Sequence, residues 1–158
     1  MNPKLLPSVI SSGLMLLLSI SIAPTIWSAS AQQPSEEQAI REMWDRFENF
    51  FYEGNSVAIG LIYTEDADRR NGQGEHARGR AEVQQMYEAI FLGRSPRQSS
   101  EANRTRFDFE VRFLRADVAL IDGFYIQATG GRGPFTVVTT KESDGWRMAA
   151  GRAGAVIE

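Results

Sequence analysis

Two side chains in this sequence have types suited to proton transfer, the carboxylate of Asp122 and the imidazole of His76. Asp122 lies in an alternating stretch, and we expect it to share one strand face with four apolar residues. Those residues are Val118, Leu120, Phe124 and Ile126. A carboxylate in apolar surroundings suits a general acid or base. The alternatives for Asp122 are a structural ion pair with Arg69 or Arg152, or a position at a strand end that is open to water.

His76 is the single histidine of the chain, and imidazole is the side chain that most readily exchanges a proton near neutral pH. If it points into a pocket beside Asp68 or Asp122, the pair could act as a general acid and base. A histidine beside a hairpin turn is also commonly a solvated surface residue. Asp122 and His76 are therefore the candidate catalytic residues, with a pocket tyrosine as an alternative partner for Asp122.

The composition argues against metal and cofactor chemistry and against nucleic acid as a partner. The chain has no cysteine, so a zinc site would depend on carboxylates. Asp66 and Asp68 are two residues apart, but two aspartates alone make a poor calcium site. We therefore expect neither a metal nor a cofactor. The net charge of −3 predicts a mildly acidic surface, which does not favour nucleic acid.

The first 31 residues are typical of a signal peptide. Lys4 precedes an uncharged run with an apolar block at 14–18, and small residues at 29–31 offer a cleavage site. The sequence predicts cleavage after Ala31, a mature domain of residues 32–158, and a periplasmic or secreted location. An uncleaved membrane anchor is the alternative, but the strongly apolar core is shorter than the ~20 residues a spanning helix needs. We expect no membrane association after cleavage.

The first half of the mature chain reads as helix, helix, hairpin and helix. Apolar residues recur at helical spacing over 35–52, with Ser35 as the expected N-cap. A short helix or turn follows at 57–63. Two strands, 63–70 and 74–79, flank the hairpin signal Asn71-Gly72, and 80–91 returns to helical spacing. We expect 93–103 to be an exposed loop.

The second half alternates with strand period. In 105–114 four apolar residues alternate with charged ones, which predicts a half-buried strand. Further strands are expected at 118–128, 135–141 and 146–153, joined by turns at 129–133 and 143–145. Helices followed by a meander of long strands indicate an α+β domain with an antiparallel sheet.

Four short motifs occur in an order that is typical of a known superfamily. They are YTEDA at 63–67, Gly79-Arg80 at a helix start, ALIDG at 119–123 and DGWRM at 144–148. In this order they resemble the nuclear transport factor 2-like superfamily, closest to its SnoaL-like and ketosteroid isomerase-like small proteins. The resemblance implies a cone-shaped curved sheet wrapped around the N-terminal helices, an internal pocket for an apolar molecule, and frequently a homodimer formed through the outer face of the sheet.

The isomerase machinery implied by this resemblance is missing. A gapless match places Phe47 where the isomerase has its oxyanion-stabilising tyrosine and Asn71 where it has its aspartate base. Val137 stands where it keeps a protonated aspartate. Enolisation needs a base and oxyanion donors, which these residues cannot supply. The sequence therefore argues against steroid isomerisation by that mechanism.

Three hypotheses follow. The first is an exported domain that binds a small apolar molecule in its cone. Its expected pocket residues are Trp44, Phe47, Tyr63, Asn71, Tyr87 and Phe124. The second is a metal-independent lyase, isomerase or cyclase that uses Asp122 with His76 or a pocket tyrosine. The third is a dimeric interaction module with a closed cone, whose outer sheet face would include the residues Ala119, Ile121, Gly123 and Tyr125.

Overall fold

The computed structural model describes residues 28–93 and 104–157, with side chains from Ser35 onward. The predicted signal peptide and the predicted loop at 93–103 fall almost entirely outside these ranges. The described elements, in chain order, are the helices α1 (Ser28–Glu53) and α2 (Ser56–Ile62), the strands β1 (Tyr63–Arg70) and β2 (His76–Arg78), the helix α3 (Gly79–Leu92), and the strands β3 (Arg106–Arg115), β4 (Val118–Ile126), β5 (Arg132–Glu142) and β6 (Gly145–Ala153).

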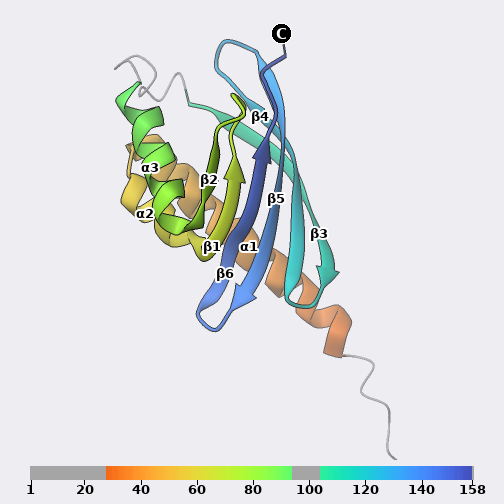
Figure 1. Ribbon diagram of the computed structural model, residues 1–158. Helices are drawn as coiled ribbons and strands as arrows, with labels where there is room; N and C mark the ends of the chain where they lie inside the picture. Colours follow the sequence, from red (N-terminus) through yellow and green to blue (C-terminus); the bar gives the residue numbers. More distant parts are fainter. Residues whose placement is uncertain (1–27, 94–103, 158) are drawn as a thin grey trace, which may run out of the picture.

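The strands form a single curved sheet in the order β2-β1-β6-β5-β4-β3 (Figure 1). Consecutive strands from β3 to β6 pair antiparallel, as do β1 and β2. The β1–β6 pairing is parallel, and these two strands are the first and last of the sheet in sequence, so no hairpin joins them. The predicted α+β class and meander are confirmed, with one parallel pairing inside the expected antiparallel sheet.

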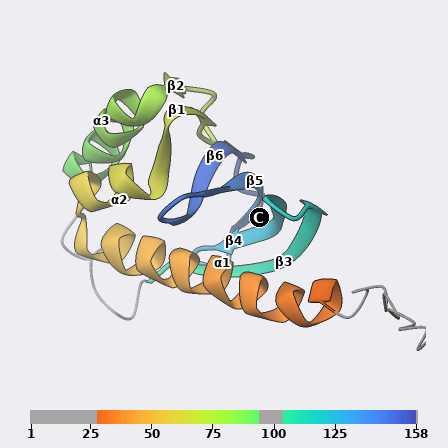
Figure 2. The same ribbon diagram turned by 90° about the horizontal axis from the view of Figure 1, so that it is seen from below.

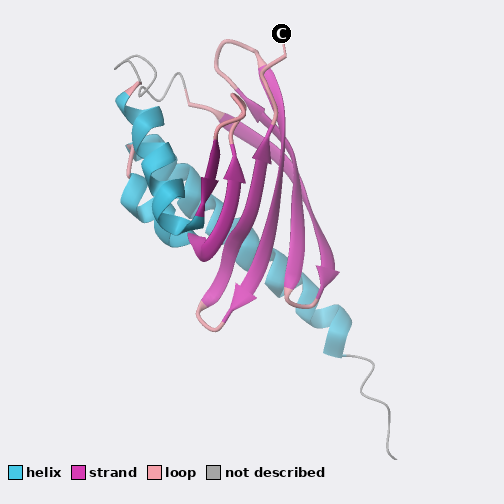
Figure 3. Ribbon diagram, in the orientation of Figure 1, coloured by secondary structure: helices cyan, strands magenta, loops and turns pink. Residues whose placement is uncertain are grey.

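The helices lie on one side of this sheet (Figure 3). Seen from below, α1 runs across the concave side beneath β3 and β4, while α2 and α3 pack beside β1 and β2 (Figure 2). The core between the layers contains the buried side chains of Ile40, Met43, Trp44, Phe47, Ile59, Val83, Tyr87, Ile121 and Met148. No helix in the described ranges is both long and apolar enough to cross a bilayer.

The apolar stripe of α1 is confirmed, but the predicted start of the helix is wrong. Ile40, Met43, Trp44 and Phe47 are all buried against the sheet. The helix begins at Ser28 and continues through the expected N-cap. Glu36 in this helix makes a tertiary contact with the sheet, where it accepts hydrogen bonds from Lys141 Nζ at 2.7 Å and Trp146 Nε1 at 2.8 Å.

The connection between β1 and β2 is longer than the predicted two-residue turn. Asn71 organises it through its side chain, since Oδ1 accepts from the backbone N–H groups of Gln73 at 3.1 Å and Glu75 at 3.0 Å. Its Nδ2 donates to Glu75 Oε2 at 2.6 Å. Gly74 has a φ of 87°, a conformation that favours glycine. An asparagine-organised loop therefore replaces the expected tight hairpin.

The two faces of β4 are the reverse of the sequence prediction. Ala119 and Ile121 are fully buried on the concave side, whereas Asp122 and Phe124 are exposed on the outer side. The alternation was predicted correctly and the direction was not. A β-bulge between Phe113 and Arg115 shifts the register of the β3–β4 hairpin and so decides which face turns inward.

Candidate functional site

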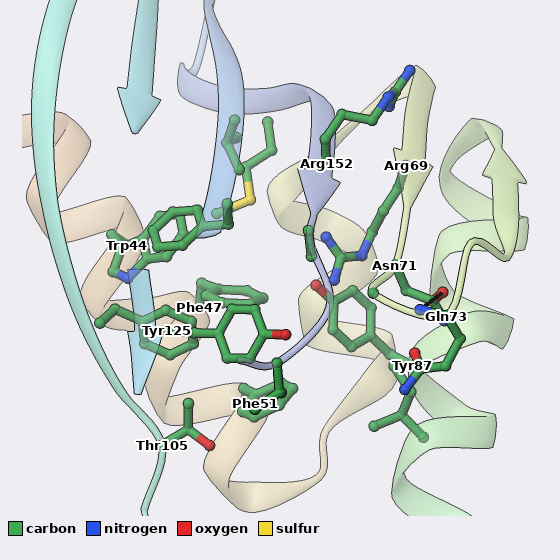
Figure 4. A pocket seen from close by; sticks show the side chains of 18 of the residues that line it. Trp44, Phe47, Phe51, Arg69, Asn71, Gln73, Tyr87, Thr105, Tyr125 and Arg152 are labelled. Carbon is green, nitrogen blue, oxygen red and sulfur yellow. Dashed lines mark hydrogen bonds between the residues drawn. The ribbon is translucent and has the colours of Figure 1, made fainter. Parts of the chain in front are cut away.

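A cavity of about 240 Å³ opens between the sheet, α1 and α3. Figure 4 shows aromatic side chains from α1 on one side and Arg69, Asn71 and Tyr87 on the other. The lining residues are Trp44, Phe47, Phe51, Tyr63, Arg69, Asn71, Gly72, Gln73, Tyr87, Ile90, Thr105, Phe107, Tyr125, Gln127, Phe135, Val137, Met148, Arg152, Ala153 and Val156. The cavity thus has an aromatic wall and a polar end.

The aromatic wall is held in place by its own ring contacts. Trp44 stacks on Phe135 with ring centroids 5.0 Å apart and planes 20° apart. It also meets Phe107 edge to face at 5.4 Å. The indole Nε1 donates to Glu48 Oε1 at 2.9 Å, and burial raises the pKa of that carboxyl although the hydrogen bond acts in the opposite direction. Such interlocked rings leave a preformed apolar surface.

The polar end combines Arg69 with two tyrosines. The hydroxyls of Tyr63 and Tyr87 lie 3.1 Å apart, within hydrogen-bonding distance, and the Arg69 guanidinium lies 4.8 Å from the Tyr87 ring centroid. Burial raises the pKa of Tyr87 well above its usual range, although the Arg69 charge opposes the shift. Burial lowers the pKa of Arg69, but the Tyr63 and Tyr87 oxygens outweigh it and the pKa ends higher than usual. Tyr87 is therefore a neutral phenol and Arg69 a cation.

Close packing surrounds two of the cavity-lining residues, Gly72 and Tyr125. The Tyr125 hydroxyl donates to the Gly154 carbonyl at 2.7 Å, which ties β4 to the chain after β6. A Cβ on Gly133 would lie 2.3 Å from that hydroxyl, and one on Gly72 would lie 2.8 Å from the Gly154 carbonyl oxygen. Side chains at these two positions would therefore displace Tyr125 or the terminal segment.

Five of the six predicted pocket residues line the cavity, namely Trp44, Phe47, Tyr63, Asn71 and Tyr87. The sixth, Phe124, lies on the outer face of the sheet, where the Arg132 guanidinium packs on its ring at 4.8 Å from the centroid. The prediction for Phe124 is wrong because the two faces of β4 are the reverse of those predicted from the sequence.

The two candidate catalytic residues do not meet. Asp122 is exposed on the outer face of β4, where it accepts a hydrogen bond from Thr136 Oγ1 at 2.5 Å. His76 is on β2, four strands away in the sheet order, which at a strand spacing of ~4.8 Å separates them by roughly 19 Å. Neither lines the cavity. The predicted Asp122–His76 pair is therefore contradicted by the structure.

His76 does pair with Asp68, as one alternative in the sequence suggested, but not inside the cone. Its Nε2 lies 2.8 Å from Asp68 Oδ2, and Arg152 pairs with the other carboxylate oxygen. The His76 hydrogen bond, with help from Arg152, lowers the pKa of Asp68 against the effect of desolvation. These groups join β2, β1 and β6, and we interpret them as structural.

The sequence analysis did not identify Arg69 as a cavity residue, nor the three phenylalanines Phe51, Phe107 and Phe135 that also line the cavity. The sequence suggests Arg69 as an ion-pair partner of Asp122 or of the Asp66 and Asp68 carboxylates, yet Arg69 and Asp122 are on opposite faces of the sheet, and the described contacts of Arg69 are with tyrosines. Alternation along β1 offered a signal, since Ala67 is fully buried and Arg69 points the same way. Among the described residues, no three His, Asp or Glu side chains gather closely enough to hold a metal ion.

The positions matched to the isomerase machinery all line the cavity. Phe47, Asn71 and Val137 surround the same space. Phe47 and Val137 offer no polar atom, and the Asn71 amide is already engaged with the backbone of its loop and with Glu75. These three side chains therefore supply neither a free base nor a free oxyanion donor to the cavity.

No protein-family model and no curated protein matches this chain. Solved structures match it in shape. A nuclear transport factor 2-like protein with a cystatin-like fold from Novosphingobium aromaticivorans superposes with a TM-score of 0.67, at 16% identity over 85% of this chain and 91% of that one. A domain of unknown function with a cystatin-like fold from Nostoc punctiforme gives 0.65, at 19% identity over 78% and 79%.

A third structure, a nuclear transport factor 2-like protein of unknown function from Shewanella oneidensis, gives a TM-score of 0.61 at 17% identity, covering 75% of this chain and 98% of that one. Identities this low establish the fold alone. The chain has the nuclear transport factor 2-like fold that its motifs predicted.

Proposed function

We propose that this protein is an exported small-molecule binding protein that takes a compact, largely apolar molecule into its cone. The cavity of about 240 Å³, with its interlocked aromatic wall, carries the proposal. An apolar cavity of ~150 Å³ is large enough for benzene, so this one suits a molecule of one or two rings. A few convergent polar groups beside an apolar wall are typical of ligand sites.

The competing hypotheses are less well supported. A closed cone does not agree with a cavity of this size. The enzyme hypothesis loses its acid–base pair, because Asp122 and His76 lie outside the cavity. A homodimer through the outer sheet face stays part of the proposal. Its apolar contacts would come from Leu120 and Phe124, and not from the concave-side residues Ala119 and Ile121.

Native mass spectrometry tests the binding proposal on protein purified from the exported fraction of its own host. We expect a small molecule that is lost on denaturation, and an N-terminal residue of Gln32. The same spectra report whether the protein is dimeric. A protein recovered without ligand, together with no binding of small aromatic probes, would contradict the proposed function.

A cavity-filling variant sharpens this test. Ile90 lies on α3 at the cavity wall and is half-buried, so Ile90→Trp should fill part of the space. We expect this variant to lose most of the bound molecule, by at least about tenfold in occupancy, since one extra ring removes the room for a ligand ring. Gln85→Trp, at an exposed position on the same helix, is the matched control and should keep the ligand. Equal occupancy in both variants would place the ligand elsewhere.

A further inference from the structure

Arg69 is a cation in the cavity wall whose interactions in the described structure include no carboxylate. Its contacts are the Tyr87 ring and the Tyr63 hydroxyl. Its Nε is fully buried and makes no hydrogen bond. Figure 4 shows the Arg69 guanidinium beside Tyr87 at the polar end of the cavity. A buried charge normally finds a counterion, because desolvation without one is costly.

Three more exposed arginines of this protein each have a carboxylate partner. Arg80 pairs with Glu65, Arg147 with Asp144 and Arg152 with Asp68. These three ion pairs are partly exposed to solvent. Arg69 faces the concave side instead, where no described acidic residue lines the cavity. Arg69 is thus a buried cation whose described contacts are with tyrosines and not with a carboxylate.

The Tyr63–Tyr87 pair offers a hydrogen-bond donor beside the Arg69 guanidinium. Each phenol has one O–H group, and the single Tyr63–Tyr87 contact at 3.1 Å uses one of the two. Arg69 cannot accept the other, because a guanidinium only donates. One phenolic hydrogen therefore remains for a ligand, next to a guanidinium with free N–H groups. Both donors suit an acceptor that carries negative charge.

We propose that the ligand of this cavity is a small carboxylic acid with a flat apolar body, bound with its carboxylate against Arg69 and the Tyr63–Tyr87 pair. This inference rests on the proposed function and names its ligand class. The flat body would lie along Trp44 and Phe47, at the aromatic wall. Arg152 also lines the cavity, but Asp68 pairs with it, so Arg69 is the lining guanidinium that can match one carboxylate in charge and in its two-pronged geometry.

The test compares three acids with their neutral amides, which have nearly the same shape. Benzoate, cinnamate and cyclohexanecarboxylate are titrated calorimetrically into the mature protein at pH 7, beside benzamide, cinnamamide and cyclohexanecarboxamide. We expect at least one acid to bind at least about tenfold more tightly than its amide, the size expected for a charge-assisted hydrogen bond. Wild-type protein suffices for this comparison, so it does not depend on a variant that folds.

Variants then assign the preference to Arg69. Arg69→Gln should remove the preference for the acid, whereas Arg112→Gln, at an exposed position on β3, should keep it. Thermal unfolding checks that both variants are folded. The inference is wrong if no acid binds more tightly than its amide, or if the preference survives in folded Arg69→Gln. Amides that bind as well as the acids would leave the proposed function standing, so the two failures are distinguishable.

Discussion

At the scale of single residues, the cavity joins an aromatic wall on α1 to a polar end that contains Arg69. Helical spacing was enough to place Trp44 and Phe47 on the inner side of α1, because one face of an amphipathic helix must meet the core. Arg69 could not be assigned in the same way. A charged residue on a strand suggests solvent, and alternation with the buried Ala67 is the one signal that the Arg69 guanidinium points to the concave side.

The Tyr63–Tyr87 contact gives a prediction at this scale. Tyr63→Phe and Tyr87→Phe each remove one hydroxyl from a buried hydrogen-bonded pair, so each should cost about 1 kcal/mol of unfolding free energy. The double variant should cost less than the sum of the two, since the second change finds the bond already lost. Urea unfolding of the four proteins measures this coupling. Strict additivity would mean that the two hydroxyls do not interact.

At the scale of elements, helices and strands were predictable because their periodicity is local, and strand faces were not. A regular hairpin between β3 and β4 would pair Asp122 with Val111 on the concave side. The bulge between Phe113 and Arg115 pairs it with Glu110 on the outer side instead. One extra residue in a strand reverses every side chain beyond it. Alternation alone carries no signal for that residue, so the candidate site inherited the error.

The β3–β4 pairing also depends on a glycine. A Cβ on Gly123 would lie 2.0 Å from the Asp108 carbonyl oxygen and 2.7 Å from the Phe109 Cα, both of them backbone atoms of β3. Gly123→Ala must therefore push the two strands apart, and we expect a loss of about 3 kcal/mol or more, typical of severe overpacking.

Gly93→Ala is the matched control for this substitution, because its added Cβ would find no atom closer than 3.7 Å and φ is −79°. Its unfolding free energy should stay within about 0.5 kcal/mol of wild type. Denaturant unfolding of both variants gives the answer. A Gly123→Ala protein as stable as the control would show that β3 and β4 can separate without cost.

At the scale of the whole molecule, hydrogen bonds join the N-terminal half of α1 to the sheet, close to the predicted cleavage site. Glu36 joins the helix to β5 and β6 through Lys141 and Trp146. It follows the predicted cleavage point after Ala31, so a mature chain that begins at Gln32 keeps this contact.

The Glu36 contact should make stability depend on pH. The hydrogen bond from Lys141, followed by that from Trp146, lowers the pKa of Glu36, so its stabilising effect is present above the pKa of the unfolded chain, about 4.3, and is lost as the pH falls through the lower folded value. We expect Glu36→Gln to lower the melting temperature at pH 7 and to approach wild type below about pH 4. Glu37→Gln, which removes an exposed pair with Arg41 on the same helix, should have little effect at either pH. A Glu36→Gln deficit that persists undiminished in acid would mean that the glutamate acts by packing and not by its charge.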